Sequence, residues 1–138
     1  MPSARKKPVV LVVDDEAHFL EIMRLKLAAS GFKPAVFQCD TAAPAAEQCM
    51  KLMPDLVLLD IYLAGKPTGL DAAYAIKKNP KTQGVRILFW SSFNRAALEG
   101  FGKSYRADIA FEEGDFLDKT ADLQMVTTRI REALTHEV

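Results

Sequence analysis

Apolar residues gather in five short runs along the chain, at positions 9–13, 35–37, 56–59, 87–90 and 116–117. Three of these runs are continuous and rich in β-branched or aromatic residues, which is typical of strands covered on both faces in a parallel sheet. The intervening segments carry apolar residues at helical spacing. This alternation, repeated five times, predicts an α/β fold: a doubly wound, five-stranded parallel sheet with helices on both faces, because crossovers between parallel strands are right-handed.

Five segments are expected to form the helices. The first ends before Gly31, a typical C-terminal stop, and the second begins after Thr41, with Pro44 tolerated in its first turn. The fourth, around positions 98–105, is weaker because Gly100 and Gly102 each cost about 1 kcal/mol of helix propensity relative to Ala. The first, third and fifth segments have clear apolar faces. These faces are formed by Phe19, Leu20, Ile22, Met23 and Leu27 in the first segment, by Leu70, Ala73, Tyr74 and Ile76 in the third, and by Leu123, Val126, Ile130 and Leu134 in the fifth.

Composition narrows the class of protein. The chain has 138 residues, of which 49% are apolar and 26% charged. These values predict one globular domain, over residues 8–138, after a disordered segment at 1–7. Cys39 and Cys49 make no disulfide framework and match no metal-binding spacing, so we expect both to be reduced thiols.

Charge and hydropathy exclude two kinds of partner. Eighteen basic and eighteen acidic residues cancel to a net charge of zero, which argues against direct binding of nucleic acid by this chain. No apolar run approaches the roughly 20 residues that a membrane span needs. The N-terminus lacks the apolar core of a secretion signal, so we expect a cytoplasmic protein.

Polar residues that can carry chemistry follow four of the five apolar runs. Asp14 and Asp15 follow the first run, Asp60 the third, Ser91 the fourth, and Lys119 comes just after the fifth. A lone acid after a strand is usually a helix cap or a solvated charge, and a lone lysine is usually a surface residue. The carboxyl ends of parallel strands, however, meet at one edge of the sheet. We therefore expect these side chains to form one site.

The physics of such a cluster predicts its chemistry. Three carboxylates a few ångströms apart repel one another by several kcal/mol per pair at an effective dielectric constant of about 20. A hard divalent cation relieves this repulsion, and Mg²⁺ suits a site with few carboxylates, with Mn²⁺ as a substitute. The ion can neutralise charge on a phosphoryl group, and Lys119 and the Ser91 hydroxyl can hold its remaining oxygens. A carboxylate can then act as the nucleophile. The pattern predicts phosphoryl transfer onto an aspartate.

Four segments then carry a family resemblance: Val-Val-Asp-Asp-Glu at 12–16, Leu-Leu-Asp-Ile at 58–61, Leu-Phe-Trp-Ser-Ser at 88–92 and Phe-Leu-Asp-Lys at 116–119. With these signatures, in this order and at compatible spacing, the chain resembles the response regulator receiver domain of two-component signal transduction, in the CheY-like superfamily. The resemblance spans roughly residues 8–135. It implies a flavodoxin-like (βα)5 fold, whose strand order is taken from the family and not from the pattern.

The resemblance also implies roles at the acidic cluster. Asp60 is the phosphoacceptor, which receives a phosphoryl group from a phosphohistidine of a sensor histidine kinase or a phosphotransfer protein. Asp14 and Asp15 bind Mg²⁺ together with Asp60 and the backbone carbonyl of Tyr62. Such a domain phosphorylates itself and can dephosphorylate itself, but it turns over no external substrate, so it is not an enzyme in the ordinary sense.

Three further residues have implied roles in switching. Ser91 hydrogen-bonds the attached phosphoryl group, Lys119 pairs with it, and Phe116 is the switch aromatic. Phosphorylation then changes the surface of the fourth helix, the fifth strand and the fifth helix, which contacts a downstream protein or an output domain missing from this chain. The sequence leaves open a homodimer that forms on phosphorylation.

The chain departs from the family pattern at several positions. Thr120 stands where many members have a proline, and Ser92 stands where a smaller residue is usual. Tyr62, Ser92 and Phe93 flank the site as modulators of access, and the two aromatics predict slow autodephosphorylation. The stretch at 106–114 makes the segment between Ser91 and the last strand longer than is common.

Three alternatives stay open from the sequence. The first is a receiver-like interaction module that works without phosphorylation. The second is a phosphatase of the haloacid dehalogenase type, which needs Asp-x-Asp after the first strand, whereas Asp14 and Asp15 are adjacent. The third is a flavodoxin, whose phosphate loop is rich in Ser, Thr and Gly.

Overall fold

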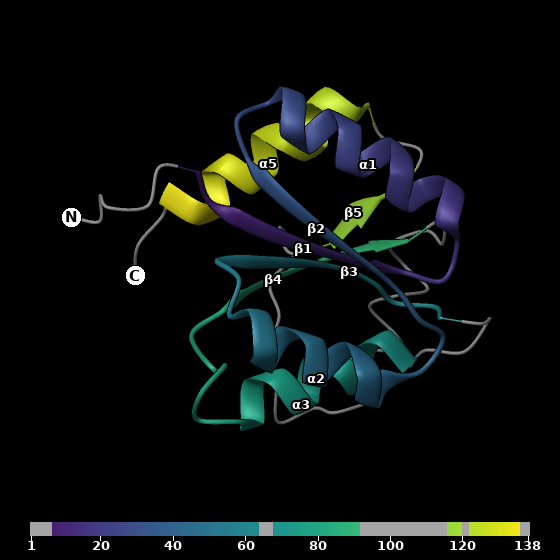
Figure 1. Ribbon diagram of the computed structural model, residues 1–138, viewed down its shortest axis with the longest axis vertical. Coiled ribbons are helices and arrows are strands. Elements are labelled where there is room, and N and C mark those ends of the chain that lie inside the picture. Colours follow the sequence, from purple (N-terminus) through teal and green to yellow (C-terminus); the bar gives the residue numbers. More distant parts are fainter. Residues whose placement is uncertain (1–6, 64–67, 92–115, 120–121, 136–138) are drawn as a thin grey trace.

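The computed structural model describes residues 7–63, 68–91, 116–119 and 122–135, in which strands and helices alternate (Figure 1). The strands are β1 (Val9–Asp14), β2 (Lys33–Gln38), β3 (Leu56–Asp60), β4 (Arg86–Ser91) and β5 (Phe116–Asp118). The helices are α1 (Ala17–Ala29), α2 (Ala42–Leu52), α3 (Thr68–Lys78) and α5 (Leu123–Thr135). The helix expected around 98–105, the stretch at 106–114 and most of the N-terminal segment lie outside the described residues.

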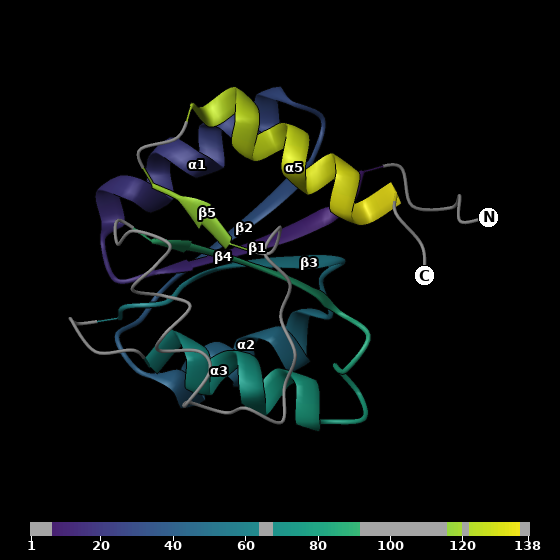
Figure 2. The same cartoon turned by 180° about the vertical axis from the view of Figure 1, so that it is seen from behind.

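The five strands form one parallel sheet in the order β2-β1-β3-β4-β5. β1 and β3 lie inside the sheet and are buried almost throughout, which explains their continuous apolar runs. The edge strand β2 consists of exposed and half-buried residues, and its apolar run is correspondingly short. Figures 1 and 2 show α1 and α5 on one face of the sheet and α2 and α3 on the other. The predicted α/β architecture is confirmed.

Successive residues of each strand face opposite apolar layers. Val12 of β1 and Leu58 of β3 pack in the layer under α1 and α5, whereas their neighbours Val13 and Leu59 pack in the layer under α2 and α3. Because side chains alternate along a strand, a residue two positions beyond Val12 or Leu58 belongs to the α1/α5 side. Asp14 and Asp60 are those residues, so the alternation directs both carboxylates to the same side of the sheet.

Local sequence sets the helix ends near the predicted positions. α1 ends at Ala29, and Gly31 has φ +94°, a left-handed conformation that glycine adopts without strain. α2 begins after Thr41 with Pro44 in its first turn, where a missing backbone N–H is harmless. The two predicted boundaries are confirmed. No described helix combines the length and the apolar character that crossing a membrane requires.

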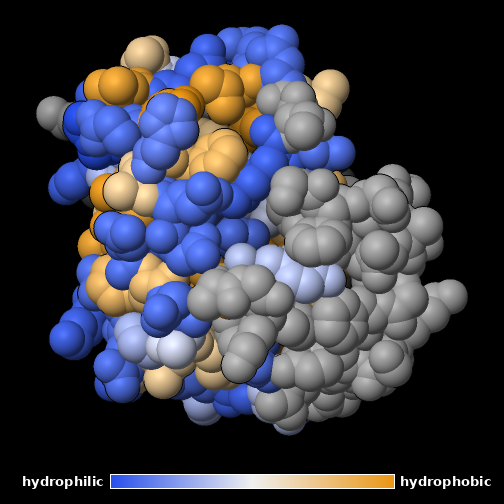
Figure 3. Space-filling view, turned by 90° about the vertical axis from the view of Figure 1, so that its right-hand side faces the viewer, coloured by the Kyte–Doolittle hydropathy of each residue, from blue (hydrophilic) through white to orange (hydrophobic). Residues whose placement is uncertain are grey.

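Figure 3 views the molecule from the side on which β1 ends and α1 begins, which is the carboxyl edge of the sheet. Hydrophilic residues form a continuous area in the middle of the described surface there, with apolar residues scattered around it. The fold therefore leaves a polar surface at the strand ends, where the sequence pattern predicts the chemistry.

Candidate functional site

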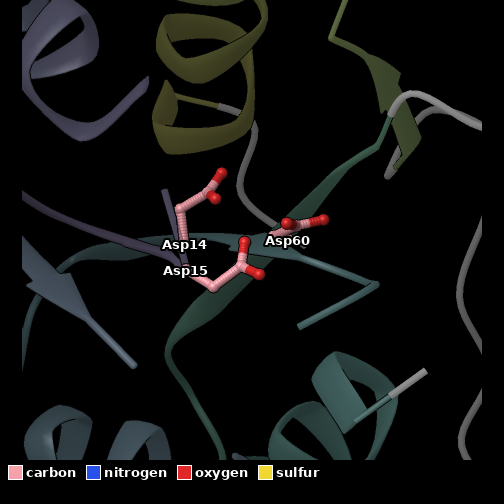
Figure 4. Close-up of side chains that lie close together, drawn as sticks. All are labelled: Asp14, Asp15 and Asp60. Atoms are coloured by element: carbon pink, nitrogen blue, oxygen red, sulfur yellow. The ribbon is translucent and has the colours of Figure 1, made fainter. Parts of the chain in front are cut away.

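Three carboxylates meet at the carboxyl edge of the sheet. Asp14 is the last residue of β1, Asp15 follows it, and Asp60 is the last residue of the neighbouring strand β3. One carboxylate oxygen from each lies within 4.8 Å of the others, and Figure 4 shows the three side chains converging. Asp14 is 0% and Asp60 3% exposed, whereas Asp15 is half-buried. Parallel neighbours in the sheet thus produce the predicted acidic cluster.

Backbone amides orient the two buried carboxylates in the same way. The Glu16 N–H donates to Asp14 Oδ1 at 2.9 Å, and the Tyr62 N–H donates to Asp60 Oδ1 at 3.1 Å. Each is a short-range hydrogen bond from the residue two positions on, a pattern that aspartate favours where a strand turns into a loop. It leaves the other oxygen, Oδ2, of each side chain for a different partner.

That partner is Lys119, which follows β5. Its Nζ lies 2.8 Å from Asp14 Oδ2 and 3.2 Å from Asp60 Oδ2, and the lysine side chain is only 7% exposed. Burial alone would lower the pKa of Lys119, but the hydrogen bond to Asp14 and the charge of Asp60 outweigh burial and raise it. The lysine is therefore a charged bridge between the ends of three strands, β1, β3 and β5.

One lysine does not compensate three acids. Burial, with repulsion from Asp14, raises the pKa of Asp60 to about 7 despite the opposing effect of Lys119. Burial also raises the pKa of Asp14 against the hydrogen bonds from Lys119 and Glu16. A cation that binds here would replace the proton of such a carboxyl group, which passes to solvent, because a metal ligand must be deprotonated.

The donor set fits a hard divalent cation. Asp14, Asp15 and Asp60 offer only oxygen, and Mg²⁺ prefers oxygen ligands, few carboxylates and several waters. The nearby thiol of Cys39 contacts the carbonyl oxygen of Thr41, and burial raises its pKa, which disfavours the thiolate that a soft metal requires. This chemistry matches the predicted magnesium site and disfavours a soft-metal site.

Two aromatic side chains around Lys119 were not anticipated from the sequence. Lys119 Nζ lies 4.4 Å from the ring centroid of Phe19 in α1 and 5.1 Å from that of Trp90 in β4. The two rings meet edge to face, with centroids 5.8 Å apart and an interplanar angle of 77°. The alternation of side chains along β4 could have indicated the contact with Trp90, because Trp90 pairs in register with Asp60 and lies on the same side of the sheet.

Gly69 is a second residue that sequence reasoning missed. Its N–H donates to the carbonyl oxygen of Ile61 at 2.9 Å. A Cβ atom added to this residue would overlap the carbonyl oxygen of Asp60, and it would lie only 2.8 Å from the Cα atom of Ile61. Because only glycine fits, the N-terminal turn of α3 can rest directly on the backbone of Asp60. The available signal was a glycine in the first turn of the third predicted helix.

The remaining predicted residues have different outcomes. Tyr62, two residues beyond Asp60, is half-buried. Ser91 ends β4, in register with Asp118, and its side chain lies outside the described residues. Phe116 begins β5 and stacks on Phe89, with ring centroids 5.1 Å apart, in the α2/α3 layer, on the opposite side of the sheet from Trp90. Outside the described residues, too, are Ser92, Phe93 and Thr120.

The chain is similar to known proteins over most of its length. The family model described as "Response regulator receiver domain" matches residues 10–131. The DNA-binding response regulator MtrA of Mycobacterium tuberculosis is 40% identical over 68 residues, which are 49% of this chain and 28% of that protein. The sensory transduction protein LytT of Bacillus anthracis is 33% identical over 94 residues, which are 67% of this chain and 36% of that protein. The matches thus span well under half the length of these relatives.

Solved structures show the same fold at low identity. A putative response regulator from Chloroflexus aurantiacus superposes with a TM-score of 0.75 at 23% identity, covering 95% of this chain and 100% of the other. The chemotaxis protein CheY4 of Vibrio cholerae superposes with a TM-score of 0.75 at 17% identity, covering 93% and 99%. With the family model matching nearly the whole length, this chain belongs to the response regulator receiver domain family.

Proposed function

We propose that Asp60 accepts a phosphoryl group in a reaction that requires Mg²⁺, and that the chain is a phosphorylation-controlled switch in two-component signalling. The observation that carries this proposal is the buried arrangement of Asp60 beside two further carboxylates and one ammonium. An acid held in this way has both the cation-binding partners and the positive charge that phosphoryl transfer requires. The family supplies the class of reaction.

In the proposed reaction, a carboxylate oxygen of Asp60 attacks phosphorus and forms an acyl phosphate. The P–N bond to a histidine of the donor breaks, and its electron pair remains on the imidazole. Lys119, which contacts Asp60 Oδ2 before transfer, is placed to pair with the arriving phosphoryl oxygens. The donor is a sensor histidine kinase or a phosphotransfer protein, and no external substrate is turned over.

Asp14, Asp15, Asp60 and the backbone carbonyl of Tyr62 would hold the metal ion. When bound, Mg²⁺ neutralises charge on the carboxylates and on the phosphoryl oxygens, and Mn²⁺ can take its place. The raised pKa of Asp60 supports this assignment, because the fold buries more negative charge than Lys119 balances.

The switch aromatic would lie on the side of the sheet that α2 and α3 cover. Ser91 would hydrogen-bond the phosphoryl group, and Phe116, which stacks on Phe89, would change its packing in response. Tyr62, Ser92 and Phe93 would limit the access of water to the phosphoaspartate. The altered surface around β5 and α5 would contact a downstream protein or an output domain, or a second copy of the chain, in the cytoplasm.

Acetyl phosphate, a small phosphoryl donor, tests the proposal without a kinase. The purified chain is incubated with acetyl phosphate and Mg²⁺, and its intact mass is measured beside that of Asp60→Asn and Asp15→Asn variants. We expect one added phosphoryl group that needs both Mg²⁺ and Asp60, and a much slower gain in the Asp15→Asn variant. Asp40→Asn is the matched control, because Asp40 is exposed and follows β2 outside the acidic cluster.

Two results would contradict the proposal. If the wild-type chain gains no mass at any Mg²⁺ concentration, the domain is an interaction module that works without phosphorylation. If Asp60→Asn is phosphorylated at the wild-type rate, the acceptor is a different residue.

A further inference from the structure

Lys119 reaches its partners across the end of a strand that lies between them. It follows β5, whereas Asp60 and Asp14 end β3 and β1, two and three strands away in the sheet. Neighbouring strands are about 4.8 Å apart, so the lysine side chain must cross the end of β4. Trp90, the second-to-last residue of β4, faces the same side of the sheet. The indole ring therefore lies along the path that the lysine takes.

The two rings are well placed to hold an ammonium group. Nζ of Lys119 lies 4.4 Å from the Phe19 centroid and 5.1 Å from the Trp90 centroid, both inside the distance of about 6 Å at which a cation is attracted to a ring face. This attraction is strongest where water is excluded, and the lysine side chain is nearly buried. Because the rings also pack edge to face, each fixes the other.

The indole N–H provides an independent reason to look for a role of the ring face. Within the described part of the chain, Trp90 Nε1 is buried and has no hydrogen-bond partner. A buried donor without a partner destabilises the folded state, and leucine or phenylalanine would fill the apolar layer without that cost. Contact between the indole face and the Lys119 ammonium explains why an indole at this position is useful.

We propose that Phe19 and Trp90 form an aromatic clamp that positions Lys119 for phosphoryl transfer. The clamp holds the ammonium between Asp14 and Asp60, where the phosphoryl oxygens arrive. Neither ring touches the reacting atoms, so both act through the lysine as positioning residues. The inference rests on the proposed function, because Lys119 acts in transfer only if Asp60 accepts the group.

Phosphorylation kinetics with matched variants test the clamp. The full chain is treated with acetyl phosphate and saturating Mg²⁺, and the maximal rate is compared for Trp90→Leu, Trp90→Phe and Phe19→Leu. We expect Trp90→Leu to lower the rate about threefold to tenfold, the range of a cation–π contact, and Trp90→Phe to restore most of it. Tyr74→Leu is the control: it removes an aromatic–lysine contact, with Lys78, in α3, and we expect the wild-type rate.

A double-mutant cycle separates positioning from packing. In a Lys119→Met background there is no ammonium to hold, so we expect Trp90→Leu to change the remaining phosphorylation rate by less than twofold. A decrease as large as in the wild-type background would mean that Trp90 only packs, and it would overturn the clamp. Thermal unfolding of each variant confirms that the compared proteins are folded.

The fluorescence of Trp90 gives a readout that needs no phosphorylation. Trp90 is the only tryptophan in the chain, so the emission spectrum reports the charge beside its ring. We expect Lys119→Met to shift the emission, and Lys78→Met to leave it unchanged. Equal spectra for Lys119→Met and wild type would overturn the clamp. If the wild type is phosphorylated and Trp90→Leu does not change the rate, the clamp is overturned and the proposed function stands. If the wild type is not phosphorylated, both are overturned.

Discussion

The two ends of β3 use an aspartate in opposite ways. Asp55 precedes the strand, is half-buried, and accepts a hydrogen bond at 2.7 Å from the N–H of Val9 at the start of β1. Asp60 ends the strand, is buried, and lies beside two more acids with its pKa raised to about 7. The first acid satisfies a backbone donor and ties two strands together. The second is held in an unfavourable setting that only a proton, a lysine or a cation relieves.

The same contrast holds for two glycines near these ends. Gly69 packs against the backbone of Asp60 and Ile61 so closely that no Cβ fits, whereas Gly84, near the amino end of β4, has open space around the position of a Cβ. Close packing is thus concentrated at the carboxyl end, where side chains must be placed accurately. The amino end tolerates looser contacts because it only fastens strands together.

Gly69→Ala is expected to have the largest effect. The added Cβ collides with backbone, which cannot rotate away, so α3 must shift and displace Asp60. We expect a loss of about 2–4 kcal/mol in the free energy of unfolding, measured by urea denaturation, and a slower phosphorylation by acetyl phosphate. Gly84→Ala is the control and should change the free energy of unfolding by less than about 0.5 kcal/mol. Similar values for both variants would contradict the contrast between the two ends.

Asp60→Asn is expected to stabilise the metal-free protein at neutral and higher pH. The folded pKa of Asp60, about 7, lies above the ordinary value of 3.8, so the folded state binds the proton more tightly than the unfolded state does. The free energy of unfolding of the wild type therefore falls as the pH rises from about 4 to about 7 and levels off above it. Asparagine carries no charge and removes this loss. We therefore expect the free energy of unfolding to rise by about 2 kcal/mol at pH 8 and to change little at pH 4. Urea denaturation in the presence of a chelator measures both values.

An Asp55→Asn variant serves as the comparison for that experiment. The amide oxygen of the asparagine can still accept the hydrogen bond from Val9. Because Asp55 is not one of the three clustered acids, we expect no rise in the free energy of unfolding at pH 8. A gain of equal size in both variants would mean that the general charge of the protein, and not the buried cluster, destabilises the fold.

Much of this arrangement could be predicted from residue patterns. Continuous apolar runs predict buried parallel strands, and the strands' carboxyl ends meet at one edge whatever the details of the loops. The meeting of Asp14, Asp60 and Lys119 therefore follows from their positions after the runs. Period-two alternation also predicts that Asp14 and Asp60 lie on the same side of the sheet. The roles assigned to Ser91, Phe116 and the residues that flank the site stay predictions.

The close contacts could not be predicted in the same way. Gly69 matters because the first turn of α3 lies against the backbone of Asp60. Trp90 matters because Lys119 crosses β4, which requires the strand order, and that order came from the family and not from the pattern. Both facts depend on distances between elements, and one-dimensional periodicity carries no such distances.

Mg²⁺ affinity should depend on pH through the carboxyl end of β3. Below pH 7 the ion must displace the proton of Asp60, so the apparent dissociation constant should rise up to about tenfold for each unit that the pH falls. Titration of Mg²⁺ at pH 6, 7 and 8, followed by calorimetry, measures this dependence. An Asp60→Asn variant should bind more weakly and with a flatter pH dependence. An affinity that is constant from pH 6 to 8 in the wild type would contradict the raised pKa.

Asp55→Ala should have the smallest effect, and it tests whether a loss of stability at the amino end of β3 changes phosphorylation at the carboxyl end. The change leaves the Val9 N–H without its acceptor at the amino end of β1, and we expect a loss of about 1–2 kcal/mol in the free energy of unfolding. Phosphorylation by acetyl phosphate should keep its wild-type rate, because Asp60 lies at the far end of the same strand. If the phosphorylation rate falls together with the free energy of unfolding, a change at the amino end of β3 displaces residues at its carboxyl end, and the two ends are not independent. If only stability falls, the strand is a rigid support whose chemistry is confined to its carboxyl end.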